Sequence, residues 1–276
     1  MLSIAVVGAG RAGQARVRAL EGNPAARLHS VVRRGDAVTL DHLIADPAVD
    51  AIAICTPNLL HPDQVQRALA GGKHVLVEFP LAPQAELARQ LLSSAARRGL
   101  VLHVEHIELL SNSQLIQRER AAPLGRLMGG ELCFTGSSSG WIGDSDLAGS
   151  PALRAVARLH RLVDLFGGAR VESAELETRD RGYRLSVSLE FASGAPIQLI
   201  EERGPELARE TRWALRCEHG LLGDPPPGHP GELFREDLDC FVERVAGREV
   251  SYLADARILH VLDLVGEIER CTGAAG

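Results

Sequence analysis

The first hundred residues alternate between short apolar runs and segments with helical spacing. The apolar runs are rich in residues that favour strands and lie near residues 2–7, 28–32, 50–54, 74–78 and 100–104. Strands that alternate with helices are typical of a parallel sheet with helices on both of its faces. We therefore expect an α/β domain built on a doubly wound parallel sheet over residues 1–118.

Residues 119–276 show a different pattern, in which apolar and polar side chains alternate along longer runs. The alternation is clearest from Tyr183 to Phe191, whose polar positions are Arg184, Ser186, Ser188 and Glu190. A period of two predicts an antiparallel sheet with one covered and one open face. We expect an α+β domain with a large, mainly antiparallel open sheet. Its polar face fits a solvated surface, a substrate floor or a dimer interface.

Two segments of the second domain have the signals of helices. Ser150 and Pro151 form a good N-cap and first-position pair for a helix over 151–166, and Gly167 ends it. Near-helical spacing of Leu253, Ile258, Leu262, Val265 and Ile268 predicts an amphipathic helix that covers a core. Residues 224–228, Asp-Pro-Pro-Pro-Gly, predict a stiff extended connection before the C-terminal helices.

Composition narrows the class of protein. The 276 residues are 45% hydrophobic and 24% charged, and the net charge of −6 is spread without a long run of one sign. A basic footprint for nucleic acid is therefore not expected, and no stretch approaches the ~18 apolar residues that span a bilayer. The five cysteines lie far apart without a Cys-x-x-Cys pair. We expect neither disulfides nor a zinc site, and a cytoplasmic protein.

A glycine-rich turn follows the first strand and opens a helix. Its residues are Gly8, Ala9, Gly10, Arg11, Ala12 and Gly13. In this position the three glycines permit a tight turn, a close approach to a pyrophosphate and close packing of helix on strand. The free N–H groups at the helix start then bind phosphate. The first domain is therefore predicted to be a Rossmann dinucleotide-binding domain.

The end of the second strand predicts which dinucleotide is bound. NAD-binding domains place an acidic residue there to hold the ribose hydroxyls, whereas this chain has Arg33 and Arg34 and no carboxylate before Asp36. Guanidinium groups match the charge and geometry of a 2′-phosphate. We expect NADPH as the cofactor, with NADH possible but weaker.

Two further segments carry a family resemblance. Residues 55–61 read Cys-Thr-Pro-Asn-Leu-Leu-His, and residues 72–80 read Gly-Lys-His-Val-Leu-Val-Glu-Phe-Pro. With the glycine turn they resemble the glucose–fructose oxidoreductase and inositol dehydrogenase superfamily. The resemblance implies cofactor contacts from Cys55, Thr56, Pro57, Asn58, His61 and Glu78. Where that superfamily has a catalytic lysine this chain has Phe79, which argues against oxidation of sugars or cyclic alcohols.

The remaining signals resemble the biliverdin reductase family over nearly the whole chain. The segments that carry this resemblance are residues 8–13, 33–34, 72–80, 101–110, 158–167 and 200–205. That family has an aromatic residue between the glutamate and the proline of the fourth strand's turn, as Phe79 is here. The resemblance implies reduction of a linear tetrapyrrole, biliverdin, at its central methine carbon with hydride from NADPH.

The resemblance and the charge of such a substrate indicate candidate substrate residues. The resemblance implies that Glu105 and Glu108 lie near the bilin pocket. Since the substrate carries two propionates, basic residues that border the polar face of the sheet are candidate anchors: Arg158, Arg203, Arg209 and Arg212.

The catalytic candidates are Glu78, Phe79, Arg158 and His160. Arg158 and His160 leave their helix about 200° apart, so only one can face the substrate, and we favour Arg158. His103, Glu105, His106 and Glu108 straddle a strand end, which disfavours a metal site. A sugar dehydrogenase and a cofactor-binding protein without catalysis remain as alternatives, and the chain is expected to be a monomer or a homodimer.

Overall fold

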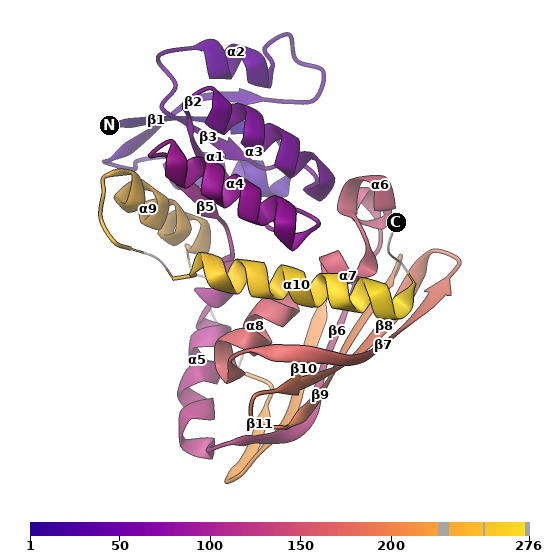
Figure 1. Cartoon of the computed structure of the whole chain (residues 1–276). Coiled ribbons are helices and arrows are strands. Elements are labelled where there is room, and N and C mark those ends of the chain that lie inside the picture. Colours follow the sequence, from indigo (N-terminus) through magenta and orange to yellow (C-terminus); the bar gives the residue numbers. More distant parts are fainter. Residues whose placement is uncertain (226–231, 251, 274–276) are drawn as a thin grey trace. The chain divides into compact units, whose positions relative to one another are not determined.

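The computed structural model describes residues 1–225, 232–250 and 252–273. The chain forms two compact units, of which the first comprises Met1–Leu110 and Gly231–Asp255 and the second comprises Ser111–Pro230 and Ala256–Gly276. Figure 1 shows the helices and strands of both units.

The first unit contains a five-stranded parallel sheet. In spatial order its strands are β2 (Ala26–Val32), β1 (Leu2–Val7), β3 (Ala51–Ile54), β4 (His74–Val77) and β5 (Leu102–Val104). The connecting helices are α1 (Arg11–Leu20), α2 (Leu40–Ala45), α3 (His61–Ala70) and α4 (Ala85–Arg97), with the 3-10 turns η1 (Asn58–Leu60) and η2 (Ile107–Leu109). All four residues of β3 are buried, because the central strands of such a sheet are covered on both faces. The predicted doubly wound sheet is confirmed.

A late segment of the chain completes this unit. The helix α9 (Leu233–Val245) packs on α1, and its Leu238, Phe241 and Val242 enter the same apolar cluster as Ile4 and Val6. The sequence division at residue 118 assigned this helix to the second domain. The structure groups it with the first, because helical periodicity predicts a covered face but not which core covers it.

The second unit contains a six-stranded sheet. Its strands, in spatial order, are β11 (Gly220–Gly223), β10 (Glu210–Cys217), β6 (Leu127–Ser137), β9 (Pro196–Gly204), β8 (Gly182–Phe191) and β7 (Ala169–Arg179). Every neighbouring pair is antiparallel except β6 and β9, which run parallel. The predicted large, mainly antiparallel sheet is confirmed.

One face of this sheet is covered by helices. Along β8 the residues from Tyr183 to Phe191 alternate between buried and partly exposed, as predicted. The helices α8 (Val156–Phe166) and α10 (Asp255–Thr272) run along the covered face (Figure 1). The unit also contains α5 (Asn112–Ala121), α6 (Ser145–Ala148), α7 (Pro151–Arg154) and the 3-10 turns η3 (Ala122–Leu124) and η4 (Gly140–Gly143).

The predicted helix over 151–166 is interrupted. The Ser150 side chain caps α7 by accepting a hydrogen bond from the Leu153 N–H, but the helix breaks at Ala155 before α8 begins. Gly167 ends α8 with a φ of +82°, a conformation that favours glycine. Of the predicted extended connection over 224–228, only Asp224 and Pro225 lie within the described residues. No helix of the described segments is long and apolar enough to cross a membrane.

Candidate functional site

The glycine-rich turn lies where the order of the parallel strands reverses, because β1 has β2 on one side and β3 on the other. Gly8 has a φ of +102°, and a Cβ atom there would lie 2.4 Å from the carbonyl oxygen of Cys55. A Cβ on Gly13 would lie 1.8 Å from the oxygen of Gly8, whereas a Cβ on Gly10 would meet no atom within 4 Å. Two glycines thus permit the turn itself, and the open space at Gly10 fits a pyrophosphate.

The start of α1 adds to this fit. Gly10 is the N-cap and has no side chain that could bind the first N–H groups, and the first turn of Arg11, Ala12 and Gly13 contains no acidic residue. The free N–H groups and the helix dipole favour an anion at this end. The predicted phosphate-binding turn therefore has the required geometry.

Arg33 and Arg34 follow β2 directly and are both exposed. The backbone N–H of Arg33 donates to the Asp36 carboxylate over 2.7 Å, which fixes the turn and occupies the carboxylate with the backbone. Two guanidinium groups are thus available at the strand end, where the ribose of a dinucleotide lies in this fold. This arrangement suits a 2′-phosphate.

Side-chain hydrogen bonds hold the turn after β3 in place. The Thr56 hydroxyl donates to the Gln64 side chain over 2.6 Å, and Asn58 is buried. His61 is fully buried, with Nε2 2.8 Å from the Thr56 carbonyl oxygen and Nδ1 2.8 Å from the Pro80 carbonyl oxygen. Burial lowers the pKa of His61, and a neutral imidazole donates to only one of these oxygens. His61 therefore lies between the two turns and donates a hydrogen bond to one of them.

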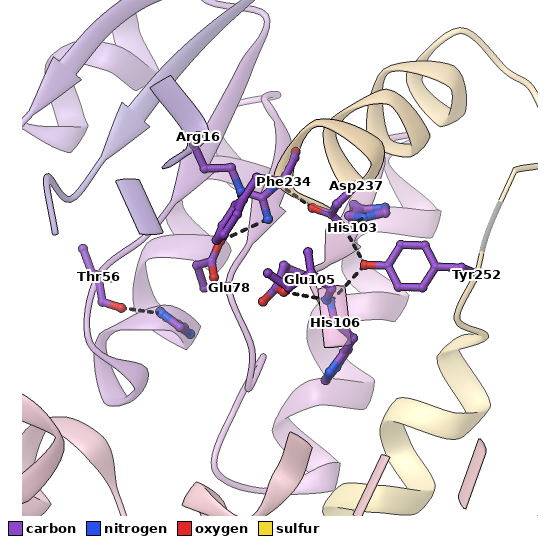
Figure 2. A network of polar contacts seen from close by, with 11 residues as sticks. Arg16, Thr56, Glu78, His103, Glu105, His106, Phe234, Asp237 and Tyr252 are labelled. Carbon is purple, nitrogen blue, oxygen red and sulfur yellow. Dashed lines mark hydrogen bonds and ion pairs between the residues drawn. The ribbon is translucent and has the colours of Figure 1, made fainter. Parts of the chain in front are cut away.

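The turn after β4 presents Glu78 and Phe79. Arg16 donates to Oε1 of Glu78 through both Nε and Nη2, each over 3.1 Å. The Phe79 ring stacks on His106 with 5.3 Å between centroids and 20° between planes, and the Phe79–Pro80 bond is cis. Figure 2 shows Arg16 pointing from α1 toward Glu78. The pairing leaves Oε2 of Glu78 outside the two bonds to Arg16.

Arg16 itself is almost entirely buried, with 1% of its surface exposed. Its Nη1 lies 2.5 Å from the Asp237 carboxylate and also donates to the Phe234 carbonyl, and its guanidinium lies over the Phe234 ring. Although burial opposes it, the carboxylates of Asp237 and Glu78 raise the pKa of Arg16. The sequence analysis did not identify Arg16 or Asp237 as site residues.

Asp237 joins the turn after β5 to α9 (Figure 2). Its Oδ1 accepts from Nε2 of His103 over 2.8 Å and from the Tyr252 hydroxyl, which in turn accepts from the His106 N–H over 2.9 Å. Arg244 donates to the other ring nitrogen of His103, so His103 is the Nε2–H tautomer. Burial opposes ionisation, but Arg16 and His103 hold the pKa of Asp237 well below its usual value.

Glu105 is the third carboxyl group of this network and has no exposed surface. Its Oε1 accepts from the Ile107 N–H over 2.6 Å, while Oε2 has no hydrogen-bond partner within the described part of the chain. Burial, Glu78 and Asp237 raise the pKa of Glu105 well above its usual value. Glu105 lies inside the unit, whereas Glu108 is partly exposed. Among the described residues no cluster of His, Cys, Asp or Glu could hold a metal.

The second unit contains a buried cluster centred on Glu201. Arg158 donates to Oε2 of Glu201 through Nε over 3.0 Å and Nη2 over 2.5 Å, and Arg203 donates to Oε1 over 2.8 Å. The Tyr183 hydroxyl also donates to Oε1, over 3.0 Å. Burial opposes ionisation, but Arg158 and Arg203 lower the pKa of Glu201. The carboxylate therefore stays charged and holds both guanidiniums.

Three arginines surround the Phe134 ring on the covered face of the sheet. The guanidinium carbons of Arg158, Arg203 and Arg209 lie 4.2, 5.1 and 5.7 Å from the ring centroid. We call this group the Phe134 arginine cluster. Arg158 and Arg203 are buried while Arg209 is exposed, so the cluster extends from the interior to the surface. Because Arg158 and Arg203 share one carboxylate, that of Glu201, this buried part of the cluster has one more positive than negative charge.

The structure separates two predicted residues from this cluster. Arg212 pairs in register with Cys133, on the open face of the sheet, and its exposed side chain binds Glu210 over 2.9 Å. His160 is buried on α8, whose residues from Val156 to Val163 are buried all round. Arg158 and His160 therefore both lie inside the unit, on different sides of the helix.

Comparison with known proteins gives a consistent result. Residues 2–106 match the family described as "Oxidoreductase family, NAD-binding Rossmann fold", and residues 118–229 match "Biliverdin reductase, catalytic". Biliverdin reductase A of Mus musculus is 35% identical over 97% of this chain and 95% of its own length, and that of Homo sapiens is 32% identical over the same shares.

Solved structures agree in fold. A biliverdin reductase from Synechocystis in complex with biliverdin and NADP+ aligns over 99% of both chains with a TM-score of 0.89 and 24% identity. A putative myo-inositol dehydrogenase from Sinorhizobium meliloti aligns over 100% of this chain and 98% of its own with a TM-score of 0.81 and 19% identity. At these identities the likeness extends to the fold.

Proposed function

This chain belongs to the biliverdin reductase family, and on that premise we propose that it reduces biliverdin to bilirubin with NADPH. The observation that carries the proposal is the Phe134 arginine cluster, where three guanidiniums surround an aromatic ring and the two buried ones share one buried carboxylate. A tetrapyrrole with two propionates complements such a site in charge.

The first unit supplies the cofactor site. The open space at Gly10 and the start of α1 suit the pyrophosphate, and Arg33 with Arg34 suits the 2′-phosphate. NADPH, when bound, supplies the hydride. The two bonds from Arg16 fix Glu78 in one orientation. Phe79 offers a flat apolar wall, which is the surface that a conjugated substrate requires.

The reaction does not need the lysine that Phe79 replaces. A conjugated bilin is already electrophilic at its central methine carbon, so the protein has mainly to orient it and exclude water. A proton must also reach a pyrrole nitrogen. Arg158 is our candidate to order the water that delivers it, because Nη1 makes none of the bonds that hold the guanidinium to Glu201. His160 stays a candidate of lower rank.

A direct assay tests the function. Purified protein mixed with biliverdin and NADPH should convert the green substrate to yellow bilirubin, and NADH should support a slower reaction. Polyols with NADP⁺ should give no turnover. Turnover of polyols without conversion of biliverdin would assign the protein to sugar oxidation, and saturable binding of both ligands without conversion would show a protein that lacks the activity.

A further inference from the structure

A polar cavity of about 580 Å³ lies at one end of the sheet in the second unit. Its walls are the turn between β7 and β8, the segment that follows β6, and Arg154 at the end of α7. The serine hydroxyls of the β6 segment are used internally, since Ser138 donates to the Arg181 carbonyl and Ser139 to the Pro205 carbonyl. Because these hydroxyls donate to backbone carbonyls, the arginines are the side chains of the cavity that could donate hydrogen bonds to a ligand.

Arg154 differs from the other arginines around it. Its guanidinium lies 5.5 Å above the Tyr183 ring, and Nη2 donates to the Gly149 carbonyl over 2.8 Å. Neither Nε nor Nη1 has a hydrogen-bond partner within the described segments, and no carboxylate there pairs with this side chain. By contrast Arg179, which lines the same cavity, is held by Glu177 and Glu202. A half-buried guanidinium with no counterion favours an anion beside it.

The charges on the cavity wall show where an anion would bind. Besides Arg154 and the paired Arg179, the wall contains exposed Arg181 and Asp180 on the turn, and Asp144, whose carboxylate caps α6. The opposite charges of Arg181 and Asp180 offset one another. With Arg179 paired and Asp144 also on the wall, the charges of the wall as a whole balance, so an anion would bind at Arg154 itself, whose guanidinium has no carboxylate partner within the described residues.

The cavity adjoins the Phe134 arginine cluster through shared side chains. The Tyr183 ring lies under Arg154 while its hydroxyl donates to Glu201, and Nη2 of Arg158 donates to the Arg154 carbonyl. A substrate held at the cluster would therefore lie within reach of the cavity. We propose that the cavity is a carboxylate subsite in which Arg154 binds one propionate of the tetrapyrrole, an inference that rests on the function proposed above.

Esterified substrate separates charge recognition from shape. Arg154→Gln should raise the KM for biliverdin at least fivefold with kcat within twofold. The KM for biliverdin dimethyl ester, which has no propionate charge, should be the same for wild type and variant. Arg179→Gln is the matched control, since it lines the same cavity but is already paired, and both KM values should stay within twofold of wild type.

Two results would overturn the subsite: an unchanged KM for biliverdin in Arg154→Gln, or an equal rise for the ester. If Arg154→Gln does not fold, Arg154→Lys serves instead, because it keeps the charge but loses the planar fork, and it should raise the KM for biliverdin alone. If wild type does not reduce biliverdin, the proposed function fails. The subsite is then tested by absorbance titration, in which Arg154→Gln should weaken binding of biliverdin and not of its ester.

Discussion

The two units each contain a buried ionic network, and the two networks have opposite imbalances of charge. In the first unit one arginine, Arg16, lies among three carboxyl groups, those of Glu78, Asp237 and Glu105. In the second unit one carboxylate, Glu201, is shared by two buried arginines, Arg158 and Arg203. In both networks the central side chain, Arg16 or Glu201, occupies a position that the hydrophobic pattern of its helix or strand assigns to the core.

The imbalances are resolved by different chemistry. A buried carboxyl group can become neutral by binding a proton, and the raised pKa of Glu105 is a shift in this direction. An arginine cannot, because its guanidinium stays charged at any pH that proteins tolerate. The excess positive charge of the Phe134 arginine cluster therefore persists until an anion binds. The first network stabilises a fold around the cofactor turn, whereas the second is suited to a charged ligand.

Removing the shared carboxylate should produce the largest effect. Glu201→Gln leaves Arg158 and Arg203 buried without a counterion, which should cost about 4 kcal/mol in the free energy of unfolding. Urea denaturation measures the loss. Glu202→Gln is the matched control, since the next residue faces the opposite side of the sheet and pairs with exposed arginines, so its loss should be under about 1 kcal/mol. Equal losses would contradict this account of the cluster.

Asp237→Asn should cost less, about 3 kcal/mol, because Arg16 retains its pair with Glu78. The pKa of Asp237 is depressed in the folded state, so its contribution is present above the unfolded pKa of about 3.9 and is lost as the pH falls. Denaturation from neutral to acidic pH should therefore show a shallower decline in the variant. Asp239→Asn, on the surface of α9, should leave the decline unchanged, and a wild-type slope in Asp237→Asn would refute the assignment.

Arg33 and Arg34 are exposed to solvent, unlike the buried arginines of the two networks. Loss of one charge-assisted phosphate contact costs about 1.5 to 3 kcal/mol, so Arg33→Ala should raise the KM for NADPH at least tenfold and leave NADH nearly unchanged. Steady-state kinetics with both cofactors measures this. Arg27→Ala, an exposed arginine earlier in β2, is the control. Equal losses for NADPH and NADH would show that Arg33 does not bind the 2′-phosphate.

Glu105→Gln should give the smallest change at acidic pH, because below the unfolded pKa the amide replaces a carboxyl that is neutral in both the folded and the unfolded state. The raised pKa of Glu105 means that its stabilising contribution is complete below the unfolded pKa of about 4.3 and is lost as the pH rises. The variant should therefore gain stability relative to wild type as the pH increases, by about 1.4 kcal/mol for each unit by which the folded pKa of Glu105 exceeds the unfolded one. Glu119→Gln on the exposed face of α5 should show no such trend. A parallel pH dependence of wild type and Glu105→Gln would mean that Glu105 is ionised.

Much of the fold could be predicted from the sequence because the signals are local. The five parallel strands lie within two residues of the predicted runs, and the glycine turn opens α1 as predicted. The family resemblance is also confirmed. The break in the helix at Ala155 could not be predicted, because neither glycine nor proline marks it.

The ionic networks were missed although the sequence contains a signal for them. Arg16 lies on the same buried face of α1 as Gly13 and Leu20. Glu201 lies on the same buried face of β9 as Leu199 and Ile197. A charged residue at a position that the period assigns to the core requires a partner. The partner comes from a distant segment, and pattern alone does not identify it. The roles of Arg158, His160, Glu108 and the other site residues in turnover stay predictions.

The position of α9 in the chain has a consequence for biosynthesis. Asp237 and Phe241, which complete the nucleotide-binding unit, are translated only after every strand of the second unit. At about 5 to 20 residues per second, the roughly 120 residues from the end of the first segment to α9 take roughly 6 to 25 s. During that interval Arg16 has no carboxylate from α9. The ribosome thus synthesises every strand of the second unit before the first unit has the helix that completes its core.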